Sequence, residues 1–149
     1  MREMRFAVVL ALGALLTQVG AAAAFTRGTA VLDTGERRVR IAIELADEPD
    51  EWRVGLMHRR SLARNAGMLF VFPRPIRGGF WMKNTLIPLS IAFLDARGRI
   101  LRIMVMTPCR ADPCPTYDPR VAYKAALEVN RGSFTRWGAR HGDTIRLVQ

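Results

Sequence analysis

Histidine is scarce in this chain, and the scarcity narrows the chemistry that the protein can perform. Only His58 and His141 occur among 149 residues. The sequence holds no His-Glu-x-x-His motif and no paired Cys and His set, so a zinc site of ordinary spacing is excluded. No serine lies in a Gly-x-Ser-x-Gly elbow, which removes a common hydrolase arrangement. We therefore expect no dedicated catalytic residue, no metal and no cofactor.

Cysteine is equally scarce, and its two copies lie close together. Cys109 and Cys114 belong to the stretch Pro108-Cys109-Arg110-Ala111-Asp112-Pro113-Cys114-Pro115. In an exported protein an even pair is typical of a disulfide, and we expect one here. A redox pair is the alternative, although the spacing is not Cys-x-x-Cys. A copper site is another, because Met104 and Met106 would share a strand face ahead of Cys109 and soft ligands select Cu(I). Methionines on a strand face more often fill a core.

Long apolar runs are absent beyond the first 24 residues. Arg2 and Arg5 precede an apolar run over residues 6–16, and Ala22-x-Ala24 has the pattern of a cleavage site. We expect residues 1–24 to be a cleaved signal peptide, with export to the periplasm or the extracellular space and no stable membrane span afterwards. An uncleaved anchor is the alternative, because the apolar stretch approaches the length of about 20 residues that spans a membrane. Residues 25–149 are enough for a single β-rich domain.

Acidic residues and lysines are also few, which leaves this domain strongly basic. Residues 25–149 hold 21 Lys and Arg against 12 Asp and Glu, a net charge of +9, and only Lys83 and Lys124 are lysines. The arginines are scattered instead of clustered among aromatics, so we expect no nucleic-acid groove. A basic surface exposed to solvent accounts for the scattered arginines. The more specific alternative is that the protein is attracted to an anionic surface of the cell envelope. That attraction would weaken with salt.

Strand patterns dominate the rest of the chain. Residues 39–45 alternate apolar and polar side chains, and residues 67–72 form a short apolar run that is typical of a buried strand. Two apolar stretches flank Asp95-Ala96-Arg97-Gly98, which is a hairpin signal. The predicted strands after residue 72 cover 89–94, 99–106, 122–129 and 144–148.

Helical signals are confined to two short places. Asp47 or Glu48 can cap a helix that has Pro49 in its first turn and carries His58 near its end, where a cation suits the helix dipole. A helical turn is expected around Phe134 and Trp137. The pattern predicts a mainly β protein, a single-domain β-sandwich or jelly-roll-like barrel of about seven strands with one or two short helices.

Polar side chains stand among apolar ones between Phe80 and Pro88. If this stretch is a strand, alternation places Trp81, Lys83 and Thr85 on one face and Asn84 on the other. Lys83 could then pair with Glu128 of a later strand, as a buried ion pair kept for structural specificity or as part of a polar cleft with an aromatic platform. The candidate ligand-binding residues are Trp81, Lys83, Asn84, Thr85 and Glu128.

Several short motifs together resemble a known family of small exported bacterial proteins. They are Gly55-Leu56-Met57-x-Arg59, Gly67-Met68-Leu69-Phe70, Phe80-Trp81-Met82-Lys83-Asn84-Thr85, Ile87-Pro88-Leu89, Pro108-Cys109, Ala126-Leu127-Glu128-Val129 and Gly142-Asp143. Over about residues 29 to 148 the chain is similar to the domain of unknown function 192. The resemblance implies a compact, mostly β fold of jelly-roll type, and it implies no activity.

Three functions are compatible with these residues. The first is a binding module for a saccharide or polyanion of the cell envelope, based on Trp81, Lys83 and Asn84 with the basic surface. The second is a hydrolase or transferase on envelope polymers, with Glu128 as base and Lys83 lowering its pKa. The third is a structural or accessory protein that docks a protein partner. We expect a monomer, and the sequence names no partner.

Overall fold

The computed structural model describes residues 25–148, and the predicted signal peptide lies outside the described residues. Its elements in chain order are β1 (Thr26–Asp33), β2 (Arg38–Ala46), α1 (Pro49–Val54), β3 (Ala66–Ile76), β4 (Phe80–Trp81), β5 (Leu89–Leu94), β6 (Ile100–Met106), β7 (Thr116–Tyr117), β8 (Tyr123–Asn130), α2 (Ser133–Trp137) and β9 (Thr144–Val148). The predicted mainly β fold with two short helices is confirmed.

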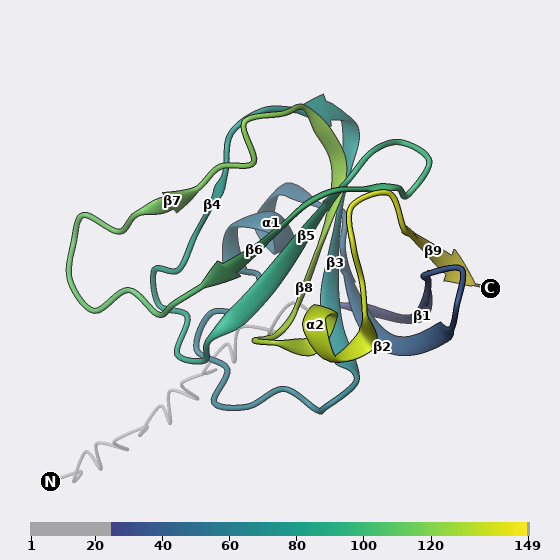
Figure 1. The fold of residues 1–149 in the computed structure, drawn as a ribbon. Helices are drawn as coiled ribbons and strands as arrows, with labels where there is room; N and C mark the ends of the chain where they lie inside the picture. The colour runs from purple at the N-terminus through teal and green to yellow at the C-terminus, as the bar shows by residue number, and fades with distance from the viewer. Residues whose placement is uncertain (1–24, 149) are drawn as a thin grey trace, which may run out of the picture.

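Seven strands form one curled sheet in the order β6-β5-β8-β3-β2-β1-β9, and β4 pairs with β7 apart from it. All neighbours in the large sheet are antiparallel except β2 and β3, which run parallel and are joined through α1. Figure 1 shows β4 and β7 projecting on one side of the sheet, with β1, β2 and β9 on the opposite side. The two sides therefore present separate surfaces.

The two edges of the large sheet meet at one end. The backbone N–H of Ile100 donates to the carbonyl of Asp143 (2.8 Å), and Gly142 donates back to Ile100 (2.9 Å). The N–H of Ile145 donates to the carbonyl of Gly98 (2.8 Å). These bonds join the start of β6 to β9, so the sheet curls into a half-barrel.

The predicted hairpin between β5 and β6 is confirmed. Asp95 accepts hydrogen bonds from the backbone N–H groups of Arg97 (2.8 Å) and Arg99 (2.9 Å), which is the local bonding that makes Asp favourable in turns. Gly98 has a φ of 75°, and a Cβ there would lie 2.2 Å from the carbonyl oxygen of Ile145. Only glycine fits where the turn meets β9.

Helix α1 begins where the sequence predicts and ends earlier. Glu48 is its N-cap, and the carboxylate of Glu51 accepts a hydrogen bond from the Glu48 N–H (3.2 Å). The helix ends at Val54, and its C-cap Gly55 has a φ of 47°. His58 follows in a turn with its own positive φ of 62°, so its predicted place at the helix C-terminus was wrong.

Two clusters of buried side chains hold the sheet together. The first includes Phe134 and Trp137 of α2, which pack against residues of β1, β2 and β9. The second is rich in aromatic rings and joins α1 to β3, β5 and β8. Within it Phe80 packs edge-on against Phe70, with 4.9 Å between the ring centroids. This aromatic core carries the candidate site. Among residues 25–148, no helix is long and apolar enough to cross a membrane.

Candidate functional site

The stretch predicted as one strand from Phe80 to Pro88 is a strand for two residues only. Phe80 and Trp81 pair with β7, Met82 is fully buried, and a turn follows at Lys83 and Asn84. The Thr85 N–H donates to the Met82 carbonyl (3.2 Å), and Asn84 has a φ of 56°, which asparagine tolerates better than most residues. The predicted alternation of faces beyond Trp81 was therefore wrong, because a turn replaces the strand.

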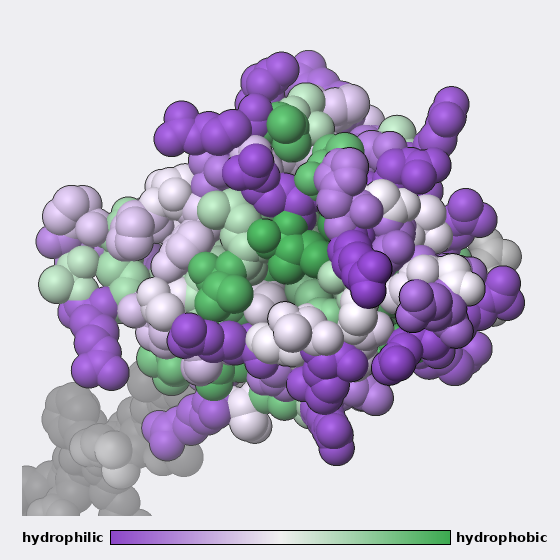
Figure 2. All heavy atoms as spheres, in the orientation of Figure 1, coloured by the Kyte–Doolittle hydropathy of each residue, from purple (hydrophilic) through white to green (hydrophobic). Residues whose placement is uncertain are grey.

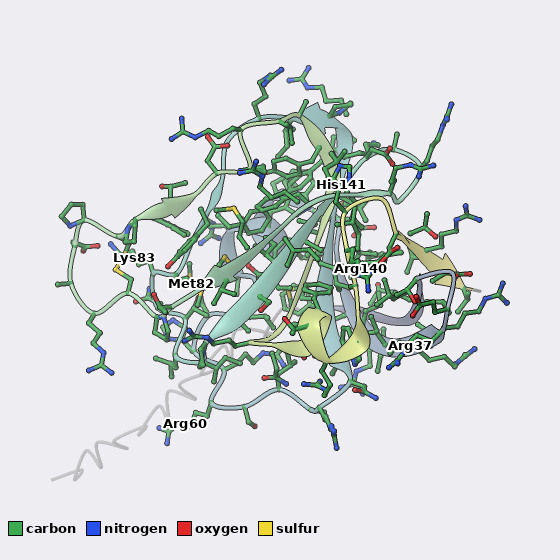
Figure 3. The ribbon with its side chains drawn as sticks, viewed as in Figure 1. Arg37, Arg60, Met82, Lys83, Arg140 and His141 are labelled. Carbon is green, nitrogen blue, oxygen red and sulfur yellow. A yellow bond between two sulfur atoms is a disulfide. The ribbon has the colours of Figure 1, made fainter. Side chains whose placement is uncertain are left out.

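Lys83 does not pair with Glu128, so that prediction was also wrong. The Lys83 ammonium lies 3.1 Å from the carboxylate of Asp112, in the loop between the two cysteines. The same ammonium lies 5.7 Å from the centre of the Trp81 ring, within cation–π range. Figure 3 shows Met82 and Lys83 on the side of the molecule that carries β4 and β7. The turn carries Lys83 away from β8 and towards the loop.

The expected disulfide is present. Cys109 and Cys114 are bonded, with 5.6 Å between their Cα atoms, and no cysteine is free among the described residues. Met106 is fully buried and Met104 packs against the aromatic core. The two cysteines therefore offer no thiolate beside these methionines. The disulfide closes the loop that presents Asp112 to Lys83.

Glu128 lies at the centre of the sheet. It is in β8 between β3 and β5, opposite Met68 on one side and Ile91 on the other, and only 5% of it is exposed. No group among residues 25–148 forms a hydrogen bond with its carboxyl. No fully enclosed side-chain N or O atom in this range lacks a partner, so the carboxyl oxygens must reach a solvent-accessible space. Burial raises the pKa of Glu128 to about 8.

That space is a hollow of about 30 Å³, which is room for one or two water molecules. It is lined from α1 and the turn after it, from β3, from the segment around β4, and from β8. The lining residues are Trp52, Arg53, Val54, Gly55, Leu56, Met57, Phe70, Phe80, Trp81, Thr85 and Glu128. Apart from Glu128, the only charged side chain in the lining is Arg53, which pairs with Asp50 at 3.0 Å. The hollow is thus lined mainly by aromatic and aliphatic side chains, and Glu128 supplies the only carboxyl group among the described lining residues.

Trp81 forms part of the rim of this hollow. Its side chain is 51% exposed, although the strand around it packs into the aromatic core. A buried carboxyl that opens into a hollow beside an exposed indole is the informative feature here, because a buried polar group is uncommon whereas a single exposed apolar side chain is not. Thr85, by contrast, is buried, and its hydroxyl donates to the Lys83 carbonyl (3.4 Å).

The structure brings together three of the five predicted site residues. Trp81, Thr85 and Glu128 line the hollow, whereas Lys83 and Asn84 line a neighbouring hollow of about 140 Å³ against the disulfide loop. We call the first group, with Phe70 and Phe80, the Trp81–Glu128 site. Sequence reasoning missed three residues that shape it.

Asp112, Gly55 and Phe70 are the missed residues. Asp112 holds Lys83 over the indole, and the only sequence signal for it was its place between the cysteines. Gly55 approaches the Phe70 ring so closely that a Cβ would lie 3.1 Å from it. Gly55 and Phe70 each belong to a motif on which the family resemblance rests, and this was the only sequence signal for them.

The chain was compared with known families, curated proteins and solved structures. Residues 30–147 match the family domain of unknown function 192, described as "Uncharacterized ACR". The comparison with curated proteins found no match.

Two solved structures have the same fold. One is a protein of Sinorhizobium meliloti 1021 described as a candidate transcription regulator, 31% identical with a TM-score of 0.78 over 85% of this chain and 97% of that one. The other is a protein of unknown function from Novosphingobium aromaticivorans DSM 12444, 28% identical with a TM-score of 0.75 over 85% of this chain and 89% of that one. With the family match spanning nearly all of the described residues, the chain belongs to the domain of unknown function 192 family.

Proposed function

We propose that this protein is a binding module for a neutral, hydroxyl-rich ring such as a saccharide of the cell envelope. The observation that carries the proposal is the Glu128 carboxyl, which is buried, lacks a partner among the described residues and opens into a hollow with Trp81 at its rim. Because no protein group in the described part of the chain bonds with this carboxyl, a ligand hydroxyl in the hollow can take the place of water as its hydrogen-bond partner.

The dimensions of the site support a ligand that sits mostly outside the hollow. A space of about 30 Å³ admits a single hydroxyl-sized group and not a whole ring. The half-exposed Trp81 then offers an apolar face on which a sugar ring can stack while one hydroxyl reaches Glu128. The Lys83 ammonium lies beside the indole, where its ion pair with Asp112 holds it, and adds a polar group next to the stacking face.

A neutral ligand agrees with the electrostatics of the hollow. With a pKa of about 8, the Glu128 carboxyl is protonated at neutral pH and both donates and accepts hydrogen bonds, as hydroxyl groups do. The overall charge of +10 disfavours a cationic ligand.

Catalysis by Glu128 is the weaker alternative. The hydrolase hypothesis needed Lys83 to lower the Glu128 pKa, but Lys83 is paired with Asp112 and burial raises that pKa. Glycoside hydrolysis uses two carboxyl groups, and the lining of the hollow contains one. We keep export to the periplasm or the extracellular space as part of the proposal, supported by the disulfide.

The test is calorimetric titration of the purified, oxidised protein with muropeptides and oligosaccharides of N-acetylglucosamine. Trp81→Ala and Glu128→Gln should each weaken binding at least tenfold. Leu86→Ala is the matched control, because Leu86 is similarly exposed, belongs to the same segment and does not line the hollow. Equal affinities in Trp81→Ala and the unaltered protein would refute the proposed site. No binding across the panel would direct the search to a protein partner, with size-exclusion chromatography testing the expected monomer.

A further inference from the structure

A third hollow lies on the outer face of β1, β2 and β9, away from the Trp81–Glu128 site. It has a volume of about 620 Å³, within the range of small-molecule sites. Its lining residues are Val31, Asp33, Arg38, Arg40, Thr144, Arg146 and Val148. Figure 1 places these three strands on the side opposite β4 and β7. Nothing in the Trp81–Glu128 site accounts for it.

The strand register places the lining residues of this hollow side by side on β2, β1 and β9. Val31 of β1 lies opposite Arg40 of β2 on one side and opposite Arg146 of β9 on the other. Since neighbouring strands are about 4.8 Å apart, the two arginine Cα atoms are separated by about 10 Å. Guanidinium groups on side chains of that length can both reach a single ligand held above the valine.

Two residues further along these strands lies the only carboxylate among the described lining residues of the hollow, that of Asp33. Asp33 lies between Arg38 and Thr144 in the same register. Its carboxylate accepts hydrogen bonds from the Gly35 N–H (2.9 Å) and the Arg38 side chain (2.9 Å), and these bonds, the first above all, lower the pKa of Asp33. Asp33 is thus already engaged with Arg38. Within residues 25–148, neither Arg40 nor Arg146 lies within salt-bridge distance of a carboxylate.

Beside the Asp33–Arg38 pair, the hollow therefore presents two further guanidinium groups, a threonine hydroxyl and an apolar floor. Arg40 and Arg146 are exposed, Val31 is half-buried between them, and Thr144 stands at one end. Two positive charges on planar donors match a doubly charged oxyanion, because each guanidinium can donate two parallel hydrogen bonds to phosphate oxygens. Val31 and Val148 can contact the uncharged part of the same ligand.

We propose that this surface, the Arg40–Arg146 groove, binds a small molecule that carries a phosphate or diphosphate group. The groove is an open depression of small-molecule size with arginines in its lining, and this concave shape favours a discrete ligand over a flat membrane surface. The unpaired arginines, Arg40 of β2 and Arg146 of β9, flank β1 instead of following a linear track, which favours it over a nucleic acid.

The test is a calorimetric titration of inorganic pyrophosphate into the purified protein at low and at physiological ionic strength. The double variant Arg40→Gln with Arg146→Gln should lose at least tenfold in affinity. The control double variant Arg60→Gln with Arg74→Gln removes the same charge from exposed positions outside the groove, and Figure 3 shows Arg60 well apart from the β1–β2 end that Arg37 marks. The control should lose less than twofold.

The remaining outcomes separate the alternatives. An equal loss in the control variant would show diffuse attraction to a basic protein and overturn the groove, as would the absence of pyrophosphate binding. Binding to vesicles of anionic phospholipid or to duplex DNA without pyrophosphate binding would overturn it in favour of a membrane or a nucleic acid. Trp81→Ala should leave the pyrophosphate affinity unchanged, which keeps this result independent of the proposed saccharide site.

Discussion

The buried carboxyl of Glu128 should make the stability of this protein fall as the pH rises. Its pKa moves from 4.5 in the unfolded chain to about 8 in the folded protein, so the folded state binds more protons between these values. The free energy of unfolding is therefore unaffected by this group below pH 4.5, decreases from pH 4.5 to about 8, and stays reduced above that. One pKa unit corresponds to about 1.4 kcal/mol, so the full effect is on the order of 5 kcal/mol. That is a large part of the 5–15 kcal/mol typical of a protein domain.

Glu128→Gln tests this magnitude, because glutamine has nearly the same shape and does not titrate. Urea unfolding of both proteins at intervals from pH 4.5 to 9 would measure it. The amide of Glu128→Gln changes the free energy of unfolding by the same amount at every pH. The unaltered protein, in contrast, loses several kcal/mol as the pH rises, so the stability of Glu128→Gln relative to it should increase by that amount. Glu36→Gln, at an exposed turn position, should follow the unaltered protein throughout. Parallel curves for Glu128→Gln and the unaltered protein would refute a buried, protonated Glu128.

Three further predictions concern the surroundings of the site. Trp81→Ala should change the free energy of unfolding by less than about 1 kcal/mol in urea titration, because half of the side chain is already exposed; a loss of several kcal/mol would make Trp81 a core residue. Replacing Cys109 and Cys114 with serine should lower stability by about 2–3 kcal/mol at most, because the closed loop is short, and should weaken saccharide binding through the freed Asp112; calorimetry measures both. Gly67→Ala should destabilise by more than about 2 kcal/mol on thermal unfolding, since its Cβ would lie 2.5 Å from the backbone oxygen of Glu128; an unchanged midpoint would contradict that packing.

Local signals in the sequence predicted much of the fold. The Asp95 to Gly98 turn and the cap at Glu48 depend on hydrogen bonds within a few residues, and both occur as expected. The buried strand from Gly67 and the late strands were visible in their apolar patterns and are present as β3, β8 and β9. The curl of one sheet onto itself depends on contacts between β6 and β9, which no local pattern encodes.

The site was harder to predict, because its geometry depends on a turn and on distant segments. The alternation of side chains between the two faces of a strand holds for Phe80 and Trp81. It fails at Lys83, because the chain turns there and Asn84 adopts a positive φ. The partner of Lys83 was visible only once the disulfide loop had been placed beside the turn. Glu128 was identified as polar in an apolar strand, but its hollow is built by α1 and β3, which lie far from it in sequence.

The surface of this basic protein is mostly hydrophilic but leaves several large apolar side chains exposed. Figure 2 shows hydrophilic residues over most of the viewed face, with apolar residues gathered near its centre over β5 and β6. The exposed large apolar side chains are Trp81, Leu86, Val105, Val121, Leu147 and Val148. Half of the Trp81 side chain is exposed, so a ligand can contact the indole.

The meeting of β6 and β9 has a consequence for how the molecule resists self-association. An unpaired strand edge is a template on which a second chain can add its own strand. At the end where Ile100 bonds with Asp143 and Gly142, each edge occupies the donors and acceptors of the other. The last strand of the chain thus protects the first hairpin on one side and the β6 edge on the other. Loss of β9 would uncover both edges at once, and aggregation would then compete with folding.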